Sequence, residues 1–345
     1  MIKVGIIGHF GFGKDLSNGQ TIKTINVTKA LSNNIGKENV FRVDTHGGLK
    51  ALFKVPFQIS SCLRKAESVI IMPANRGLQI ISPLLLSLNK RKKRKIHYIV
   101  VGGWLPSLCL QKPKLAEKIR KFDCVYVETL TMKKALEEQG FSNVILMPNF
   151  KYLTPLSYAE LKYQSQEPLP LCTFSRVMKE KGIEDIVEAV KRINDRENKI
   201  IFSLDIYGEP DSSQINWFNL LCSEFPPYIQ YKGCVSPDKS VDVVKNYFAL
   251  VFPTKFYTEG LPGTILDAYS AGVPVIASRW ENFDDLIEEG KTGAGFEFNN
   301  LDDLISVLTK LSQHYDSFNK MKQNCLTKAQ CYSPENVIKV LLSRL

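Results

Sequence analysis

Residues 250–277, LVFPTKFYTEGLPGTILDAYSAGVPVIA, carry the strongest structural signal in this chain. The apolar run 250–252 predicts a strand that leads into a loop, and Pro262 suits the first turn of the helix that follows. Gly272 ends that helix, and the apolar run 273–277 predicts the next buried strand. A buried strand, a loop, a helix and a second buried strand are typical of a parallel sheet covered by helices.

The same alternation extends along the whole chain. Strands are predicted at 4–7, 40–43, 68–72, 96–101, 125–127, 144–146, 171–174, 200–207 and 229–231. Helices are predicted at 21–32, 78–88, 114–121, 131–139, 183–193, 240–247, 264–271 and 301–311. The proline-rich stretch 148–170 reads as a linker. We therefore expect two βα domains, 1–164 (completed by a C-terminal helix at 333–345) and 165–332. A ligand cleft is expected between their two sheets.

Composition narrows the class of protein. Of 345 residues, 44% are hydrophobic and 23% are charged, which excludes a disordered chain, collagen and a coiled coil. The sequence has no apolar run near the roughly 20 residues of a membrane-spanning helix. The eight cysteines form no CxxC pair, so neither a zinc site nor a disulfide framework is indicated. We expect a reduced, cytoplasmic protein with no metal and no cofactor.

The positive charge is concentrated in the first half of the chain. Residues 1–150 hold 24 Lys and Arg against 9 Asp and Glu, whereas residues 151–345 hold 21 against 26. The longest basic run is Lys90, Arg91, Lys92, Lys93, Arg94 and Lys95. Such a run indicates an anionic partner, and a solvated loop is the equally weighted alternative. A nucleic-acid-binding protein is a rival interpretation, although the run lacks the interleaved aromatic residues that stack on bases.

A glycine-rich loop follows the first predicted strand. Residues 8–15, GHFGFGKD, nearly match the phosphate-binding GxxxxGK[ST] motif, which leaves a P-loop kinase or NTPase (Gly8 to Lys14) as an alternative function. Asp15 argues against that reading, because it replaces the hydroxyl that would hold magnesium. The loop leads to a helix that starts near Gly19, where backbone amides can approach a phosphate or a sugar.

Two carboxylates and a helix start occur together in the motif quoted first. The free amides of Gly263 and Thr264 make an anion site at the start of the predicted helix. Glu259 lies just before that helix and Asp267 one turn inside it, so both can face one ligand. Carboxylates suit sugar hydroxyls, because each oxygen accepts hydrogen bonds.

These residues resemble the family 4 glycosyltransferases, which are retaining enzymes of the GT-B fold. The family signature has an acidic residue, seven residues and a second acidic residue, with EGxP at its front and AxGxPVIA behind. Glu259 and Asp267 hold the acidic positions, with Asp in place of the commoner Glu. Arg176 and Lys181 match the basic pair that contacts the donor diphosphate in the family. The resemblance covers residues 170–310, while the first domain matches by its layout and its Asn18–Thr21 loop.

The resemblance implies an α/β GT-B enzyme that moves a sugar from a nucleotide-diphosphate sugar, UDP rather than GDP, to an acceptor. The acceptor would be a glycan or a lipid-diphosphate-linked one, in surface polysaccharide synthesis such as capsule formation. Attachment to an anionic membrane surface through Lys90–Lys95 is expected, and nucleic acid is not. The catalytic residues would be Glu259, Arg176 and Lys181. The donor would contact Gly19, Arg176, Lys181, Glu259, Gly260, Leu261, Pro262, Gly263, Thr264 and Asp267.

One family feature is missing from this sequence. Many members carry a His after the fourth strand, near the donor sugar, but here the chain reads Val101-Gly102-Gly103-Trp104. His97 stands at the wrong end of that strand. His9, near the glycine loop, could reach the cleft, although a simple loop histidine is the favoured reading. Which residue takes the place of the missing His is left open.

Overall fold

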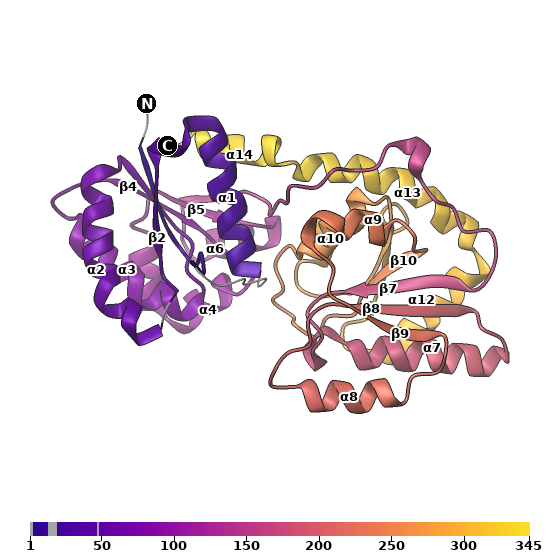
Figure 1. The fold of residues 1–345 in the computed structure, drawn as a ribbon. Coiled ribbons are helices and arrows are strands. Elements are labelled where there is room, and N and C mark those ends of the chain that lie inside the picture. The colour runs from indigo at the N-terminus through magenta and orange to yellow at the C-terminus, as the bar shows by residue number, and fades with distance from the viewer. Residues whose placement is uncertain (1–2, 13–18, 47) are drawn as a thin grey trace. The chain divides into compact units, whose positions relative to one another are not determined.

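The computed structural model of the chain describes residues 3–12, 19–46 and 48–345. The chain divides into two compact units, each a parallel sheet with helices packed on it (Figure 1). The first unit is Met1–Lys151 together with Tyr332–Leu345, and the second is Tyr152–Cys331. The two-domain α/β architecture expected from the sequence is confirmed.

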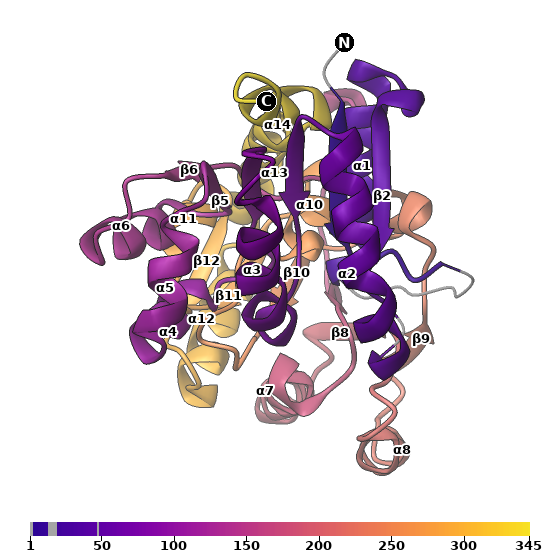
Figure 2. The ribbon, with the colours of Figure 1, turned by 90° about the vertical axis from the view of Figure 1, so that its left-hand side faces the viewer.

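The first unit is built on a six-stranded sheet of order β2-β1-β3-β4-β5-β6, in which every neighbouring pair is parallel. Figure 2 shows β2 and β6 at the two margins of this sheet. The strands are β1 (Val4–Gly8), β2 (Val40–Asp44), β3 (Ser68–Ile71), β4 (Lys95–Ile99), β5 (Cys124–Val127) and β6 (Val144–Leu146). All of them lie where apolar runs predict strands, because strands buried on both faces need continuous apolar sequence.

The helices of the first unit cover this sheet. They are α1 (Gly19–Ile35), α2 (Gly48–Lys65), α3 (Asn75–Asn89), α4 (Leu105–Gln111), α5 (Pro113–Ile119), α6 (Leu130–Glu138) and α14 (Pro334–Leu342). Side chains of α2 to α6 pack with strand residues in one apolar core, and α14 packs against α1. The side chain of Ser333 caps α14 by accepting a hydrogen bond from the Asn336 N–H.

Helix α2 was not predicted from the sequence. Its buried residues Val55, Ile59, Cys62 and Leu63 have helical spacing, but Pro56 stands inside the helix and obscures the pattern. Helices α4, α8, α11 and α13 also lie outside the predicted helical segments. For α8 the reason is a weak pattern, since Phe218 is its one fully buried side chain.

The second unit repeats the design with a six-stranded parallel sheet of order β12-β11-β10-β7-β8-β9. Its strands are β7 (Leu169–Phe174), β8 (Phe202–Tyr207), β9 (Ile229–Gly233), β10 (Ala249–Phe252), β11 (Val275–Ser278) and β12 (Gly293–Phe296). Its helices are α7 (Ile183–Glu197), α8 (Ile215–Ser223), α9 (Ser240–Val244), α10 (Gly263–Ser270), α11 (Phe283–Leu286), α12 (Leu301–Gln313) and α13 (Tyr315–Ala329). Short 3₁₀ turns in the two units are η1 (Lys37–Asn39), η2 (Tyr158–Glu160), η3 (Lys179–Lys181), η4 (Pro237–Lys239) and η5 (Gln330–Tyr332).

The proline-rich stretch after residue 151 runs along the second unit, which begins earlier than the boundary at 165 that we expected. The Leu156 N–H donates to the Ser270 carbonyl at 2.9 Å, and Leu161 is buried. The Asn319 side chain exchanges hydrogen bonds with the backbone of Gln164. Proline content indicates an irregular path, but these contacts decide to which unit the segment belongs.

The strand order marks one edge in each sheet. β1 lies between β2 and β3, and β7 lies between β8 and β10, so the direction of strand addition reverses at β1 and at β7. In parallel sheets, ligands bind beside the carboxyl ends of the strands at such a reversal. Within the described part of the chain we find no helix whose length and apolar content would allow it to span a bilayer.

Candidate functional site

The candidate site of the second unit lies where β7 and β10 end. β7 ends at Phe174 and continues into Arg176 and η3, which contains Lys181. β10 ends at Phe252 and continues through a loop that contains Glu259 into α10. Because β7 and β10 are parallel neighbours, these segments leave the sheet at the same edge.

Lys181 and Glu259 form an ion pair at this edge. The Lys181 Nζ lies 2.5 Å from the Glu259 Oε2, and the two side chains are 14% and 22% exposed. The ammonium also lies over the rings of Phe252 and Phe256, at 5.3 and 5.1 Å from their centroids. The rings limit the access of water to the pair, which strengthens its electrostatic attraction.

Gly182 allows η3 to approach the loop after β10. Its φ is +70°, and a Cβ at this position would lie 1.9 Å from the carbonyl oxygen of Pro253. A larger residue would therefore clash with the backbone and would also strain φ. The glycine that follows Lys181 in the sequence motif is thus a requirement of packing.

The loop that carries Glu259 is held through its backbone. The carbonyl of Glu259 accepts hydrogen bonds from Trp280 Nε1 at 3.1 Å and from Asn282 Nδ2 at 2.7 Å, and both of those side chains are buried. The Thr254 hydroxyl lies 3.5 Å from the Glu259 carboxylate. The carboxylate is therefore positioned by several contacts besides Lys181, none of which the sequence motif reveals.

Helix α10 starts beside this loop with an unsatisfied polar group. Pro262 is its N-cap and supplies no side-chain hydrogen bond to the helix start. Thr264 is 8% exposed, and within the described residues its buried Oγ1 has no hydrogen-bond partner. A buried hydroxyl without a partner costs about 1–3 kcal/mol, so this position is prepared for a ligand oxygen.

Asp267 lies one turn further along α10 and is buried. Its Oδ1 accepts a hydrogen bond of 2.7 Å from the Ser240 hydroxyl, at the start of α9. The sequence predicts that Asp267 and Glu259 face one ligand, whereas the described hydrogen bonds connect each carboxylate to a different neighbour. The predicted role of Asp267 stays a prediction.

Arg176 leaves the same edge but pairs with a different residue. Its guanidinium lies 3.6 Å from the Asp211 carboxylate, and half of its side chain is exposed. Hydrogen bonds from the side chain and backbone of Ser213 hold the pKa of Asp211 below its usual value. Sequence reasoning missed Asp211, although Asp followed two residues later by Ser is a known turn pattern.

The carboxyl edge of the first sheet holds a polar cluster around two histidines. His9 Nδ1 lies 2.8 Å from the Thr21 hydroxyl, and His9 Nε2 lies 3.0 Å from His46 Nδ1. Asp44 accepts hydrogen bonds from the N–H groups of Phe10, Phe12 and His46. Burial and the neighbouring His46 lower the pKa of His9. Burial acts to raise the pKa of Asp44, but the backbone N–H groups outweigh it and lower this pKa.

Two other features of the first unit bear on the predictions. Gly19 begins α1, and a Cβ added to it would meet nothing within 4 Å, so its proposed donor contact stays a prediction. In the P-loop alternative, Gly13 and Lys14 lie outside the described residues. Among the residues that are described, no group of three or more His, Cys, Asp or Glu is placed to hold a metal ion.

A buried ion pair lies near the position of the missing family histidine. Lys23 on α1 pairs with Glu128, which follows β5, and both residues are 4% exposed. The Lys23 ammonium also donates to the Val100 carbonyl at 2.7 Å. Val100 lies two residues before Gly102, whose φ is +82°. Sequence reasoning missed this pair, and the one signal for it was a lysine among the apolar positions of a helix.

The basic run 90–95 connects α3 to the start of β4. It therefore lies at the amino end of β4, the sheet edge opposite to the histidine cluster. Arg94 Nε donates to the Leu63 carbonyl and Lys95 Nζ to the Leu345 carbonyl. Lys90, Arg91 and Lys92 are exposed.

Comparison with known proteins finds similar sequences and structures. Residues 170–314 match the profile of the family described as glycosyl transferases group 1. An uncharacterized glycosyltransferase of Methanocaldococcus jannaschii is 26% identical over 156 residues, which cover 45% of this chain. The chain spans about two fifths of that relative's length, since the match covers 39% of it.

Solved structures resemble the chain over its whole length. HepE from Anabaena in complex with UDP superposes with a TM-score of 0.77 and 12% identity, with 100% of both chains covered. Sucrose-phosphate synthase from Thermosynechococcus elongatus gives a TM-score of 0.75 at 13% identity, with 99% of this chain and 97% of that one covered. The predicted GT-B fold is thereby confirmed. Residues 170–314 are similar to the glycosyl transferases of group 1, and the comparisons support an enzyme of the glycosyltransferase class.

Proposed function

We propose that this protein is a retaining glycosyltransferase that takes a sugar from a UDP-sugar and transfers it to a glycan or a lipid-linked acceptor. We place this reaction in surface polysaccharide synthesis. The observation that carries the proposal is the Lys181–Glu259 pair beside the start of α10, where Thr264 Oγ1 has no hydrogen-bond partner among the described residues. The complexes of HepE with UDP and with UDP-glucose support a uridine nucleotide as the donor carrier.

The positive groups of the site suit a leaving diphosphate. When the bond between the sugar and the diphosphate breaks, negative charge develops on the phosphate oxygens. Lys181, Arg176 and the free N–H groups of Gly263 and Thr264 would stabilise that charge. Gly260 and Gly263, on either side of Leu261 and Pro262, have no side chain and would let the ligand approach the backbone. Preorganised donors of this kind each contribute about 2.7–4 kcal/mol to catalysis.

The two carboxylates would bind hydroxyl groups of the donor. Glu259, in the loop, would accept hydrogen bonds from the sugar, and Asp267, inside α10, from the ribose. A carboxylate has about four lone-pair sites, so the Ser240 hydroxyl on Asp267 does not exhaust its capacity.

The reaction itself exchanges one bond for another at the anomeric carbon. The bond to the diphosphate oxygen breaks, and a bond to the acceptor oxygen forms on the same face. The acceptor proton passes to an oxygen of the leaving diphosphate, so that no side chain of the protein has to act as the base. Glu259 is paired with Lys181, which suits the binding of hydroxyl groups better than the removal of a proton.

The division of roles between the carboxylates can be tested by calorimetry. Asp267→Asn should weaken the binding of UDP about tenfold, the size of one hydrogen bond to a charged group. Glu259→Gln should bind UDP as the parent protein does and should lose turnover with the UDP-sugar. Equal losses of UDP affinity in both variants would contradict the assignment. A panel of UDP- and GDP-sugars, scored by release of the nucleotide, identifies the donor.

We also propose a cytoplasmic location, with salt-reversible attachment to an anionic membrane surface through Lys90–Lys95. Lys90, Arg91 and Lys92 are exposed, and each basic residue near such a surface contributes about 1 kcal/mol. Vesicles with anionic lipid should carry the protein in flotation at low salt and release it at 1 M salt. Reversal of these three residues to Glu should abolish flotation, whereas reversal of the exposed Lys37, Lys121 and Lys134 should weaken it less. Equal flotation of both variants would exclude a specific role for the run.

A further inference from the structure

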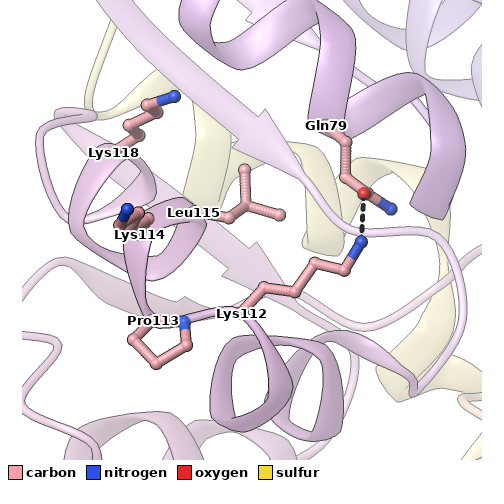
Figure 3. Close-up of a pocket in the computed structure, with 6 residues that line it drawn as sticks. All are labelled: Gln79, Lys112, Pro113, Lys114, Leu115 and Lys118. Atoms are coloured by element: carbon pink, nitrogen blue, oxygen red, sulfur yellow. Dashed lines mark hydrogen bonds between the residues drawn. The ribbon is translucent and has the colours of Figure 1, made fainter.

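A hollow of about 530 Å³ lies between α3 and α5 in the first unit (Figure 3). Its lining is Gln79 from α3 and the segment of Lys112, Pro113, Lys114, Leu115 and Lys118. Figure 3 shows Leu115 between Lys114 and Gln79, while Lys112 extends toward the Gln79 amide. This hollow is therefore apolar at its base and basic at its rim.

Among the described residues, no carboxylate forms an ion pair with any of the three lysines of the hollow. Lys112 Nζ donates to Gln79 Oε1 at 2.5 Å, and an amide oxygen carries no net charge. Within the described residues, Lys114 and Lys118 take part in no ion pair, and neither does Glu117 on the same helix. Three like charges around one concavity raise the local concentration of anions.

The arrangement is held in place before any ligand binds. Gln79 Nε2 donates to Asn75 Oδ1 at 2.7 Å, which fixes the amide and directs its oxygen toward Lys112. Leu115 is buried in the core of the unit, and α5 packs against α3. The positions of the lysine backbones therefore do not depend on a flexible loop, and the site loses little entropy on binding.

The chemistry of the hollow suits a phosphate group. An ammonium presents three hydrogen-bond donors around a point charge, which suits the oxygens of a phosphate in many orientations. Nucleic acid is disfavoured, because none of the lining residues is an aromatic on which a base could stack. The volume exceeds that of one phosphate, and Pro113 and Leu115 offer an apolar wall to whatever the phosphate carries.

We infer that this hollow binds a phosphate-bearing ligand, with Lys112, Lys114 and Lys118 as its cationic contacts. The phosphate has two possible sources, a soluble diphosphate ester or the headgroup of a lipid. The inference goes beyond the proposed transfer reaction, since the residues that would bind the donor diphosphate lie in the second unit. The hollow also differs from the proposed membrane attachment through Lys90–Lys95. The hollow has fixed walls and would bind one phosphate group, whereas the basic run would contact many lipid headgroups.

The test is calorimetry with pyrophosphate on the full chain. Pyrophosphate also suits the proposed donor site, so the titrations use an Arg176→Ala/Lys181→Ala background in which that site is disabled. The additional pair Lys114→Ala/Lys118→Ala should reduce the remaining affinity at least about tenfold, as expected for loss of charge-assisted hydrogen bonds. Lys121→Ala is the matched control, because Lys121 is exposed, adjoins α5 and does not line the hollow. Pyrophosphate affinity that is absent in the background protein, or equal in all variants, would overturn the inference.

Flotation distinguishes the two sources of phosphate. Vesicles are prepared with phosphatidic acid or with phosphatidylserine at equal surface charge, in the Lys90→Glu/Arg91→Glu/Lys92→Glu protein. If the phosphate belongs to a lipid, the protein should bind vesicles with phosphatidic acid better than vesicles with phosphatidylserine. Lys114→Ala/Lys118→Ala should remove this preference, and Lys121→Ala should retain it. No preference, together with the calorimetric loss, identifies a soluble ligand. A preference that all variants share would exclude the hollow as the lipid site.

Discussion

Two Lys–Glu pairs stand at strand carboxyl ends in this protein, one in each unit, and their surroundings differ. The Lys23–Glu128 side chains are 4% and 3% exposed, and Lys23 also donates a hydrogen bond to the Val100 carbonyl. The Lys181–Glu259 side chains are 14% and 22% exposed and lie beside aromatic rings. The nearby start of α10 has a buried Thr264 hydroxyl that no described residue hydrogen-bonds. The first pair is enclosed by protein, and the second retains an accessible side.

Enclosure decides what such a pair can do. A fully buried pair has been desolvated during folding, so its charges act on the structure and not on a ligand. The charges of a partly exposed pair can contact substrate oxygens with little additional loss of hydration. We therefore assign a structural role to Lys23–Glu128 and a ligand-binding role to Lys181–Glu259, and mutation should separate the two.

The largest effect should come from the enclosed pair. Lys23→Met leaves the Glu128 charge buried without its partner, and we expect a loss of about 3–5 kcal/mol in the free energy of unfolding. Urea denaturation measures this loss. The double variant Lys23→Met/Glu128→Leu should recover most of it, because no charge remains to be solvated. A single variant as stable as the parent protein would remove the structural assignment.

Mutation of the partly exposed pair Lys181–Glu259 should reduce activity much more than stability. Lys181→Ala should lose about 2–4 kcal/mol of transition-state stabilisation, since a donor aimed at the leaving diphosphate is gone. Its stability should change by less than about 1 kcal/mol. Steady-state kinetics with the UDP-sugar and urea denaturation of the same preparation provide the two values.

Variants of two residues near Lys181 test whether the loss of activity is specific to the ion pair. Lys179→Ala is a matched control, because Lys179 lies in the same 3₁₀ turn but contacts the Trp217 ring. It should keep its activity. Arg176→Ala should lose less than Lys181→Ala, since half of the Arg176 side chain is exposed to solvent. If Lys179→Ala and Lys181→Ala lose the same activity, the effect belongs to the turn and not to the ion pair.

A third lysine extends the comparison to a buried ammonium that forms no ion pair with any carboxylate of the described chain. Lys322 on α13 is 1% exposed and donates to the Tyr247 carbonyl at 3.1 Å. Burial lowers its pKa from 10.5 to about 8. Between pH 8 and 10.5 the unfolded chain therefore binds more protons at this residue than the folded protein does, and stability rises with pH.

Lys322→Met should remove that dependence. The stability of the parent protein, measured relative to Lys322→Met, should increase by about 1–3 kcal/mol as the pH rises from 7.5 to 10. Other titrating groups are common to both proteins and cancel in the difference. Urea denaturation at a series of pH values gives this difference, and a constant value across the series would show that Lys322 titrates as an exposed lysine.

Local sequence alone predicted eleven of the twelve strands that the structure describes, most of the helices around them and the order of the motifs. The strand that was missed is β12, whose sequence Gly-Ala-Gly-Phe contains no continuous apolar run. Strands such as 250–252 and 273–277 are buried on both faces, so they require continuous apolar runs that are visible without a structure. The start of α10 at Gly263, after Pro262, likewise follows from residues within a few positions of one another. Arg176 and Lys181 were named from the resemblance to the family 4 glycosyltransferases, and Glu259 was named both from that resemblance and from its position just before the predicted helix.

The tertiary structure decided which of those residues meet. Lys181 reaches Glu259 across 78 positions of sequence, and Lys23 reaches Glu128 across 105. These contacts depend on the strand order, which places β7 beside β10 and brings α1 to the ends of β4 and β5. Apolar runs specify that strands are buried but not which strands are neighbours. For the same reason, the Ser240 partner of Asp267 and the hollow formed by Gln79 and Lys112 emerged only when the helices were packed on their sheets.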